Sequence, residues 1–328
     1  MTFSVVREKL ENLSRYYTLE QGVLRWPSVF MLPGWLDAWW QSFGADYSTH
    51  LLLVCRDDTV IGIAPLKIKE GVVSFIGNNS VCDYLDFITA SDAEDDFAIA
   101  LLDFLREQEV SVLQLETLRP DSVAAVSVAR EAQRRGWVLD FTHLETSAEL
   151  ELPLDWEGYL GLLSSHQRQD VERKILRLEN VAPLRFDVLH NTMASGTELD
   201  NFLQMMAGSR RDKEQFLTSE MRVFFRRLAS AMAGYGMLRL GFLYVGVARV
   251  AGVLYFDYRD RIYLYNSGYA VQYADINAGL VSKLYTIRHA IAEGKKTFDF
   301  LKGPEAYKTY LGGRKINLLR CDITVNPV

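Results

Sequence analysis

The chain has 328 residues, of which 49% are hydrophobic and 24% are charged, and its formal net charge is −6. This length exceeds what one hydrophobic core usually serves, and the composition is that of a globular protein, so we expect two folded domains of roughly 150 residues each. The acidic balance argues against a DNA-binding protein or another sequence-independent nucleic-acid binder, because such proteins normally present a basic surface.

The N-terminus is charged at Arg7, Glu8 and Lys9, where a secretory signal would need an apolar stretch, so a cytoplasmic protein is expected. The most apolar later segment, 238–256, contains two arginines and three glycines. It therefore predicts paired strands and no membrane insertion.

The potential metal ligands are scattered. The cysteines are odd in number and far apart, which favours reduced thiols, and the histidines show no ligand spacing: Cys55, Cys82 and Cys321; His50, His143, His166, His190 and His289. No metal is expected.

Hydrophobic periodicity and turn residues predict the elements of the first half in chain order. They are a helix at 35–43, strands at 51–56, 60–67, 72–76 and 83–89, a helix at 93–108, a strand at 112–116, a helix at 121–135 and a strand beginning at 137.

The second half repeats this order after a helical connection at 156–179. Its elements are a strand at 184–189, helices at 198–215 and 219–233, strands at 238–245, 248–257 and 261–269, a helix at 277–293, a strand at 297–301, a short helix from Pro304 and a strand at 316–324. A repeated order indicates a duplicated domain. We expect domains at 1–150 and 151–328, the second carrying the active centre.

The segment Thr297–Gly312 is the most informative. Asp299 places a carboxylate in an otherwise apolar strand, where it needs a partner or a chemical role. Gly303 permits an unusual turn, and the proline after it favours the start of a helix. For this segment alone, an ion pair between Asp299 and Lys302 or Lys308 is the favoured interpretation.

Several segments in a fixed order, from about residue 30 to 312, resemble one known family. They are Pro33–Gly44 (PGWLDAWWQSFG), Ile63–Leu66 (IAPL), Cys82–Phe87 (CDYLDF), Ser165–Arg168 (SHQR) with the basic helix after it, and Phe298–Lys308 (FDFLKGPEAYK). The chain thus resembles the GNAT-fold acetyltransferase-like proteins of the CelD/BcsL group, which is associated with cellulose biosynthesis and related in fold to the FemABX peptidyltransferases.

The resemblance implies an α/β (α+β) fold with two tandem GNAT-like domains, each a mixed, largely antiparallel sheet flanked by helices. It implies an acyltransferase that moves an acyl group to an amine or hydroxyl. The expected acceptor is a small molecule or glycan precursor, bound in the inter-domain cleft and linked to polysaccharide or cell-envelope synthesis.

The catalytic candidates are Asp299, Glu305, Tyr307 and Lys308. Direct attack by the acceptor needs a base, for which we expect Asp299 or Glu305. Lys308 or Lys302 would hold an anionic part of the substrate or stabilise the oxyanion, and Tyr307 would protonate the leaving thiolate or simply pack.

Four further residues are candidates for substrate binding. Asp83 and Tyr84 form a polar pair that interrupts two hydrophobic runs, and the resemblance places this motif near the inter-domain cleft. His166 and Arg168 lie near the start of a basic helix, where free backbone amides attract anions. For these two, a capping or surface role is the favoured interpretation.

The donor site is expected at the start of the helix near 277, with Asn277, Ala278, Gly279 and Ser282 as the cofactor-binding candidates. Asn277 can cap the helix, and Gly279 lets a phosphate approach its N-terminus. Acetyl-CoA or another acyl-CoA is the expected donor. The full glycine pattern usual in GNAT proteins is missing, which leaves other activated acyl donors open.

Two alternatives remain. One is a FemABX-like transferase that uses aminoacyl-tRNA, which the acidic balance and the lack of a coiled-coil arm disfavour, so a tRNA partner is possible but not favoured. The other is a non-catalytic binding protein in a polysaccharide-assembly system. No G-x-S-x-G, Walker, H-E-x-x-H or strand-linked G-x-G-x-x-G motif occurs, so hydrolase, NTPase, zinc-enzyme and dehydrogenase functions lose support.

Overall fold

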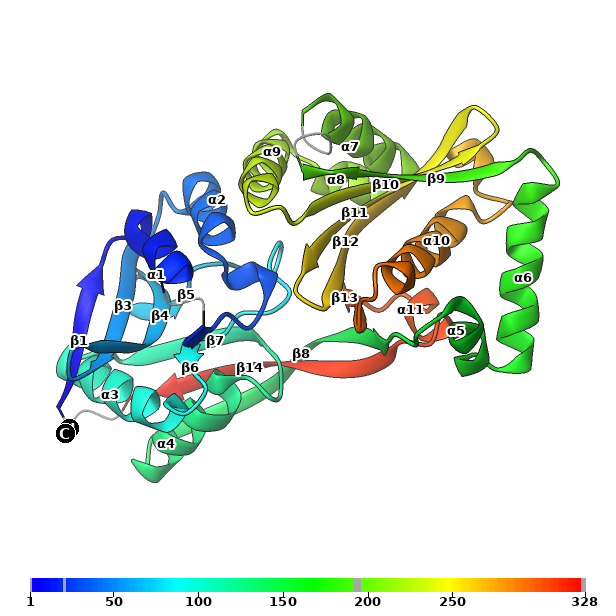
Figure 1. Cartoon of the computed structure of the whole chain (residues 1–328). Helices are drawn as coiled ribbons and strands as arrows, with labels where there is room; N and C mark the ends of the chain where they lie inside the picture. The colour runs from blue at the N-terminus through cyan, green and yellow to red at the C-terminus, as the bar shows by residue number, and fades with distance from the viewer. Residues whose placement is uncertain (1, 20–21, 192–195, 326–328) are drawn as a thin grey trace. The chain divides into compact units, whose positions relative to one another are not determined.

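The computed structural model describes residues 2–19, 22–191 and 196–325. The chain divides into two compact units, the first formed by Met1–Thr146 with Asn317–Val328 and the second by Ser147–Ile316. Each unit contains a mixed set of paired strands flanked by helices (Figure 1), so the expected α/β class is confirmed.

In the first unit the strands follow the order β1-β3-β4-β5-β7-β14, and β6 pairs with β4 and with β2. The strands are β1 Phe3–Glu8, β2 Leu24–Arg25, β3 Ser48–Arg56, β4 Thr59–Lys69, β5 Val72–Phe75, β6 Ile88–Ala90, β7 Val112–Leu118 and β14 Arg314–Thr324. The helices are η1 Leu10–Asn12, α1 Leu13–Leu19, η2 Val29–Met31, α2 Pro33–Phe43, α3 Glu94–Glu107, the π-helix η3 Ala124–Val128 and α4 Ala129–Arg134.

The strands of the second unit follow the order β8-β13-β12-β11-β10-β9, and β8 begins in the first unit and ends in the second. The strands are β8 Val138–Glu151, β9 Leu184–His190, β10 Leu238–Val245, β11 Ala248–Tyr258, β12 Arg261–Tyr269 and β13 Thr297–Lys302. The helices are α5 Trp156–Leu162, α6 Ser165–Glu179, α7 Thr197–Ser209, α8 Arg211–Phe216, α9 Ser219–Gly234, η5 Val271–Tyr273, α10 Ala278–Ala292 and α11 Tyr307–Tyr310.

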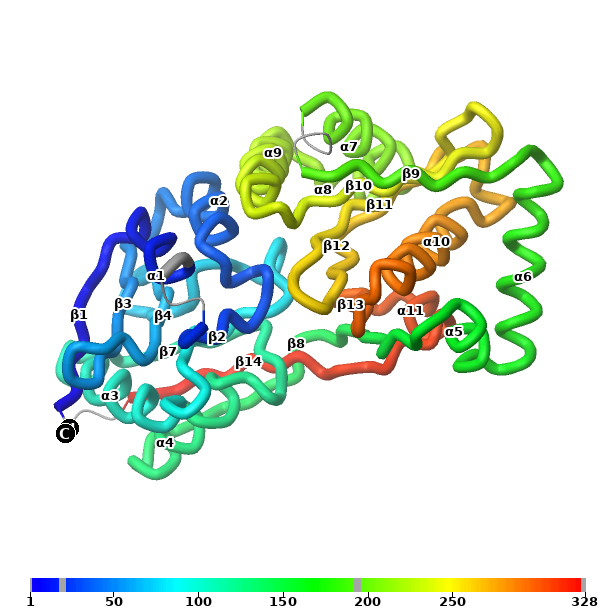
Figure 2. Tube along the Cα trace, viewed as in Figure 1, coloured from blue at the N-terminus to red at the C-terminus, as the bar shows by residue number. Residues whose placement is uncertain are grey.

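The two units share one connection pattern, which Figure 2 lets the eye follow along the chain. Three antiparallel strands (β3-β4-β5 and β10-β11-β12) lead into a helix (α3 and α10), and the next strand (β7 and β13) pairs in parallel with the last strand of the three. The repeated order expected from the sequence is therefore present in space.

The alternation of side chains along β11 fixes the layers of the second unit. Val253 and Tyr255 belong to a core cluster that includes Leu284 and Ile287 of α10. On the other face Gly252 lies against Phe202 of α7. Helix α10 therefore covers one face of these strands and α7 to α9 cover the other (Figure 1).

Several element boundaries differ from the expectation. The expected helix at 198–215 is divided into α7 and α8, and the short helix expected from Pro304 begins only at Tyr307. Strand β1 was not anticipated. Residues 317–328 group with the first unit and not with the C-terminal half, because β14 pairs with β7.

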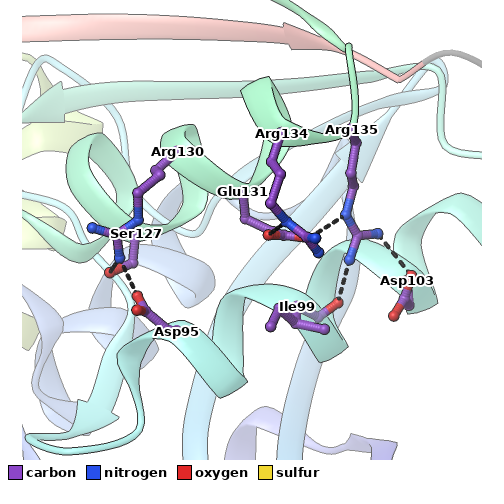
Figure 3. Close-up of polar contacts among 8 residues, drawn as sticks. All are labelled: Asp95, Ile99, Asp103, Ser127, Arg130, Glu131, Arg134 and Arg135. Atoms are coloured by element: carbon purple, nitrogen blue, oxygen red, sulfur yellow. Dashed lines mark hydrogen bonds and ion pairs between the residues drawn. The ribbon is translucent and has the colours of Figure 1, made fainter.

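Helix α4 is fixed to α3 by arginine side chains (Figure 3). Arg135 donates to Asp103 at 2.7 Å, to the carbonyl of Ile99 at 3.0 Å and to Glu131 at 2.8 Å. Arg134 also donates to Glu131, at 2.7 Å. The side chain of Arg135 is 12% exposed and that of Arg134 is 69% exposed. The hydrogen bonds of Arg135 are therefore largely shielded from water, and those of Arg134 are not.

None of the helices in the described ranges is long and apolar enough to span a bilayer.

We predict that Arg135→Ala lowers the free energy of unfolding by about 2–3 kcal/mol, because charged hydrogen bonds are lost and the buried Glu131 loses one partner. Arg134→Ala is the matched control and should cost less than about 1 kcal/mol, because its side chain is largely solvated. Urea unfolding of both variants measures the difference. Equal losses would contradict the assignment of Arg135 as the residue that joins the two helices.

Candidate active site

The candidate site lies in the second unit where two parallel strands stop pairing. Strand β13 pairs with β12 only from Arg261 opposite Thr297 to Tyr263 opposite Asp299, although β12 continues to Tyr269. The β11–β12 register shifts at this level, so that Tyr265 is an extra residue in β12. Side chains from α8, α10 and the 303–308 segment gather beside these strand ends.

Lys308 fixes the turn that follows β13. Its ammonium group donates to the carbonyl oxygens of Leu301 at 2.9 Å, Lys302 at 2.5 Å and Gly303 at 3.3 Å, and it forms an ion pair with Glu305 at 3.0 Å. The side chain is buried. These contacts satisfy the donors of the ammonium group, so the geometry favours Lys308 as an anchor of the turn over a group that holds substrate.

Asp299 is also an anchor by its placement. Its side chain is 0% exposed; one oxygen lies 3.0 Å from Arg261, and the other accepts from the backbone N–H of Leu301 at 2.9 Å. Arg261 also binds Glu149 at 2.7 Å. Burial alone would lower the pKa of Arg261, but Asp299 and the other nearby groups hold it above its usual value. Arg261 is therefore a partner of Asp299, while Lys308, one of the two lysines expected there, pairs with Glu305.

Lys283 on α10 and Tyr307 lie together beside the strand ends. The ammonium group of Lys283 is 4.9 Å from the centroid of the Tyr307 ring, and it donates to the carbonyl of Gly279 at 2.9 Å. The Tyr307 ring in turn packs against Phe300 of β13. The hydroxyl of Tyr307 has no hydrogen-bond partner within the ranges that the structure describes, so it is available to a ligand.

Two lysines at this site, Lys283 and Lys213, donate to backbone carbonyls and have no carboxylate in hydrogen-bond contact among the residues that the structure describes. Lys283 is 7% exposed, and burial, together with the charge of Lys213, lowers its pKa to about 7. Lys213 on α8 donates to the carbonyl of Ser267 in β12. Burial, together with the charge of Arg210, lowers the pKa of Lys213 to about 8. Near neutral pH a fraction of each lysine is therefore an uncharged amine.

Sequence reasoning passed over Lys283 and Lys213. For Lys283 the available signal was a lysine on a helix whose neighbouring positions are apolar, among them Val281, Leu284 and Ile287. The helix of Lys213 is rich in charged residues and offered no such signal. A charged side chain at such a position must be paired, neutralised or functional.

Glu305 lies folded back over the turn. Burial would raise its pKa, but the ammonium group of Lys308 and the charge of Arg210 lower it overall, so the carboxyl group is ionised at neutral pH. A Cβ atom at Gly303, whose φ is +126°, would lie 2.3 Å from the Glu305 carboxylate. The backbone conformation therefore favours glycine, and a larger residue would have to displace the Glu305 carboxylate.

The expected donor site at the start of α10 has a mixed outcome. Asn277 precedes the helix in a left-handed conformation, and its side chain makes no capping bond to the helix as described. Ala278 and Ser282 are buried, and the Ser282 hydroxyl donates to Gly279 at 3.0 Å. A Cβ at Gly279 would lie 2.9 Å from the Tyr269 ring, so packing explains this glycine. What remains available to a phosphate is the helix N-terminus itself.

The remaining expected residues are spread out. His166 is exposed near the start of α6, and Arg168 forms exposed ion pairs with Glu157 and Glu172, as a surface role predicts. Lys302 ends β13. Asp83 and Tyr84 belong to the first unit; both are buried, and the Tyr84 ring contacts Phe30 and the Arg119 guanidinium.

Among the residues that the structure places, no group of histidine, cysteine and carboxylate side chains could hold a metal ion.

One part of the chain matches a known protein family. Residues 165–309, which contain the site, match the family described as "Acetyltransferase (GNAT) domain". No curated protein matches the sequence significantly. The part of the chain that matches, within the second unit, therefore has the fold of a GNAT acetyltransferase domain.

Solved structures extend the similarity over nearly the whole chain. FemX matches with 14% identity and a TM-score of 0.64, covering 98% of this chain and 98% of FemX. The C-terminal domain of a putative lysylphosphatidylglycerol synthetase from Agrobacterium fabrum matches with 9% identity and a TM-score of 0.58, covering 95% and 90%. L-PGS from Bacillus licheniformis matches with 12% identity and a TM-score of 0.57, covering 87% and 90%. At these identities the likeness concerns the fold.

We predict that Gly303→Ala destabilises the second unit by about 2 kcal/mol, because the new methyl group strains the backbone and displaces the Glu305 carboxylate. Gly294→Ala is the control: its φ of +69° is also left-handed, but nothing lies within 4 Å of a new Cβ. It should cost about 1 kcal/mol from the backbone alone. Thermal and urea unfolding compare the two; an equal cost would show that the space over Gly303 is not constrained.

We also predict that stability rises between pH 7 and pH 10. The unfolded lysines, whose ordinary pKa is 10.5, bind more protons in this range than the folded lysines do, so unfolding becomes less favourable as pH rises. Each lysine contributes a slope of at most about 1.4 kcal/mol per pH unit. Urea unfolding at several pH values should give a smaller slope for Lys283→Met. Lys315→Met, at an exposed lysine of β14, is the control and should leave the slope unchanged. An unchanged slope in Lys283→Met would refute the claim that the Lys283 charge is buried.

Proposed function

We propose that the second unit is an acyltransferase that moves an acyl group from a CoA thioester to the amine or hydroxyl of a small-molecule or glycan-precursor acceptor. The observation that carries the proposal is the pair of Lys283 and Tyr307, placed where β12 and β13 stop pairing and inside the segment that matches the acetyltransferase family.

The chemistry requires a proton acceptor and a proton donor. An attacking amine forms the new C–N bond, the C–S bond of the thioester breaks, and the amine must give up a proton. Lys283, with its pKa near 7, accepts that proton as a neutral amine. Burial raises the pKa of Tyr307, so its hydroxyl stays protonated and donates to the leaving thiolate while the Lys283 ammonium group returns a proton to it, which leaves no tyrosinate. The ionised Glu305, beside Lys308, attracts the acceptor while the acceptor amine still carries its positive charge.

In this proposal the residues of Thr297–Gly312 have other roles than those expected from the sequence. Asp299 and Lys308 position the turn, and Lys283 and Tyr307 carry out the proton transfers. The start of α10, at Ala278 and Gly279, receives the phosphates of the donor, because the first N–H groups of a helix favour an anion. The segments shared with the CelD/BcsL group support a place for the chain in that group and an acceptor from polysaccharide or cell-envelope synthesis.

One observation favours a second donor class. The Ser282 hydroxyl is engaged with Gly279, and Gly279 is required by the Tyr269 ring, so the helix start offers a CoA pyrophosphate fewer groups than a glycine-rich turn does. An aminoacyl ester on tRNA needs no such turn. The fold likeness to FemX is compatible with this alternative.

The test measures CoA release from acetyl-CoA with a panel of amino sugars, polyamines and amino acids. We expect acceptor-dependent release, with Lys283→Met and Tyr307→Phe slower by about 100-fold, the usual effect of a proton-transfer group. Lys283→Met should also remove the rise in rate as pH increases through about 7. Tyr310→Phe, on the same helix, loses a bond to Asp170 but should keep its rate.

The binding arm decides between the alternatives. Calorimetric binding of aminoacyl-tRNA with no response to any CoA thioester would replace the proposed donor by the tRNA ester. A donor that binds the native protein must also stabilise it against unfolding. If neither donor binds or stabilises the protein, the catalytic proposal fails, and the alternative of a non-catalytic binding protein is left.

A further inference from the structure

The first unit contains a pocket of about 350 Å³ that the proposed transfer does not use. It is lined by Tyr47, which precedes β3, and by residues of β4, β5, β7 and their connections, including Lys67, Ser74, Asn78, Gln114 and Glu116. This volume lies at the lower end of the range for small-molecule sites, about 300–1,000 Å³. All of its lining residues belong to the first unit.

Strand register explains why a pocket forms here. Lys67 lies opposite Ser74, Ser74 opposite Gln114, and Gln114 opposite Asp322, so four neighbouring strands place polar side chains in one row on one face. The adjacent positions Leu66, Phe75 and Leu113 are buried on the other face. A sheet face in a domain core is normally apolar and covered by other elements. This row is polar, and part of it is left uncovered.

The charged groups of the pocket already have partners within the protein. The ammonium group of Lys67 donates to the carbonyls of Phe75 and Gly77 and lies 4.8 Å from the Trp39 ring centroid. Lys69 pairs with Asp46 at 3.5 Å, and Glu116 pairs with Arg320 at 3.0 Å. Glu70 lies exposed in the β4–β5 turn at the rim. The lining therefore presents little uncompensated charge to a ligand.

The uncharged groups are the ones left available. Among the residues that the structure describes, the Gln114 amide, the Ser74 hydroxyl and the Tyr47 hydroxyl have no hydrogen-bond partner. The Asn78 side-chain oxygen accepts from the backbone N–H groups of Ser80 and Val81, and within the same ranges its amide nitrogen has no acceptor. Amide and hydroxyl groups beside an aromatic ring recognise a ligand by directed hydrogen bonds and stacking, not by net charge.

We infer that this pocket binds a neutral, polyhydroxylated ligand of the size of a mono- or disaccharide, with Gln114 and Ser74 donating and accepting at its hydroxyl groups and Tyr47 at the rim. The inference concerns binding by the first unit and stands without the transfer reaction.

The experiment uses the full chain with no acyl donor. Cellobiose, N,N′-diacetylchitobiose and maltose are titrated by calorimetry and by saturation-transfer NMR. We expect saturable binding of at least one of them, weakened about tenfold or more in Gln114→Ala and in Ser74→Ala, since each variant removes a hydrogen bond to the ligand. Gln133→Ala, at an exposed glutamine of α4, is the matched control and should bind as the unaltered chain does.

Circular dichroism melting shows that each variant is folded, and Ser74→Ala keeps the test decisive if Gln114→Ala does not fold. Binding of a neutral sugar should be the same at low and high salt. Absence of binding by all three sugars, or binding that Ser74→Ala leaves unchanged, overturns the inference. Binding of inorganic phosphate that salt abolishes would identify an anion site in its place. Because no donor is present, these outcomes leave the acyltransferase proposal to its own test.

Discussion

The buried ammonium group of Lys308 is the constraint on which the arrangement of the candidate centre depends. By binding the carbonyls of Leu301, Lys302 and Gly303, it closes the chain into a turn directly after β13. This turn puts Glu305 over Gly303 and brings the Tyr307 ring under Lys283. A lysine is suited to this task, because its three donors can satisfy carbonyls that point to one place.

A second constraint holds β13 from the other end. The pair of Asp299 and Arg261 joins β13 to β12 at the last level where the two strands pair, and Glu149 of β8 joins the same guanidinium. Burying such a group is tolerable only when each charge has partners. The charged groups that have several partners hold the backbone in place. Tyr307 and the partly neutral Lys283 are the side chains that remain available for the proposed chemistry.

The two polar features of the molecule have different physical origins. In the second unit, lysines are carried into an apolar environment, and burial shifts their pKa values toward neutrality. In the first unit, the pairing register places Ser74 and Gln114 in one row, and the neighbouring charges are satisfied internally. The first arrangement suits proton transfer, and the second suits hydrogen bonding to a neutral ligand.

The sequence by itself determined the order and type of nearly all the elements, because hydrophobic periodicity and turn residues are local properties. It also singled out Thr297–Gly312, since a carboxylate in an apolar strand followed by Gly-Pro is visible in the letters alone. The sequence did not predict boundaries that depend on long-range strand pairing. One example is the end of the second domain, because β14 pairs with β7 of the first unit. Only the tertiary structure decided the contact of Asp299 with Arg261, the anchoring role of Lys308 and the shifted pKa values of Lys283 and Lys213. The physical reason is that burial and nearby charges come from residues that the fold, and not the chain order, brings together.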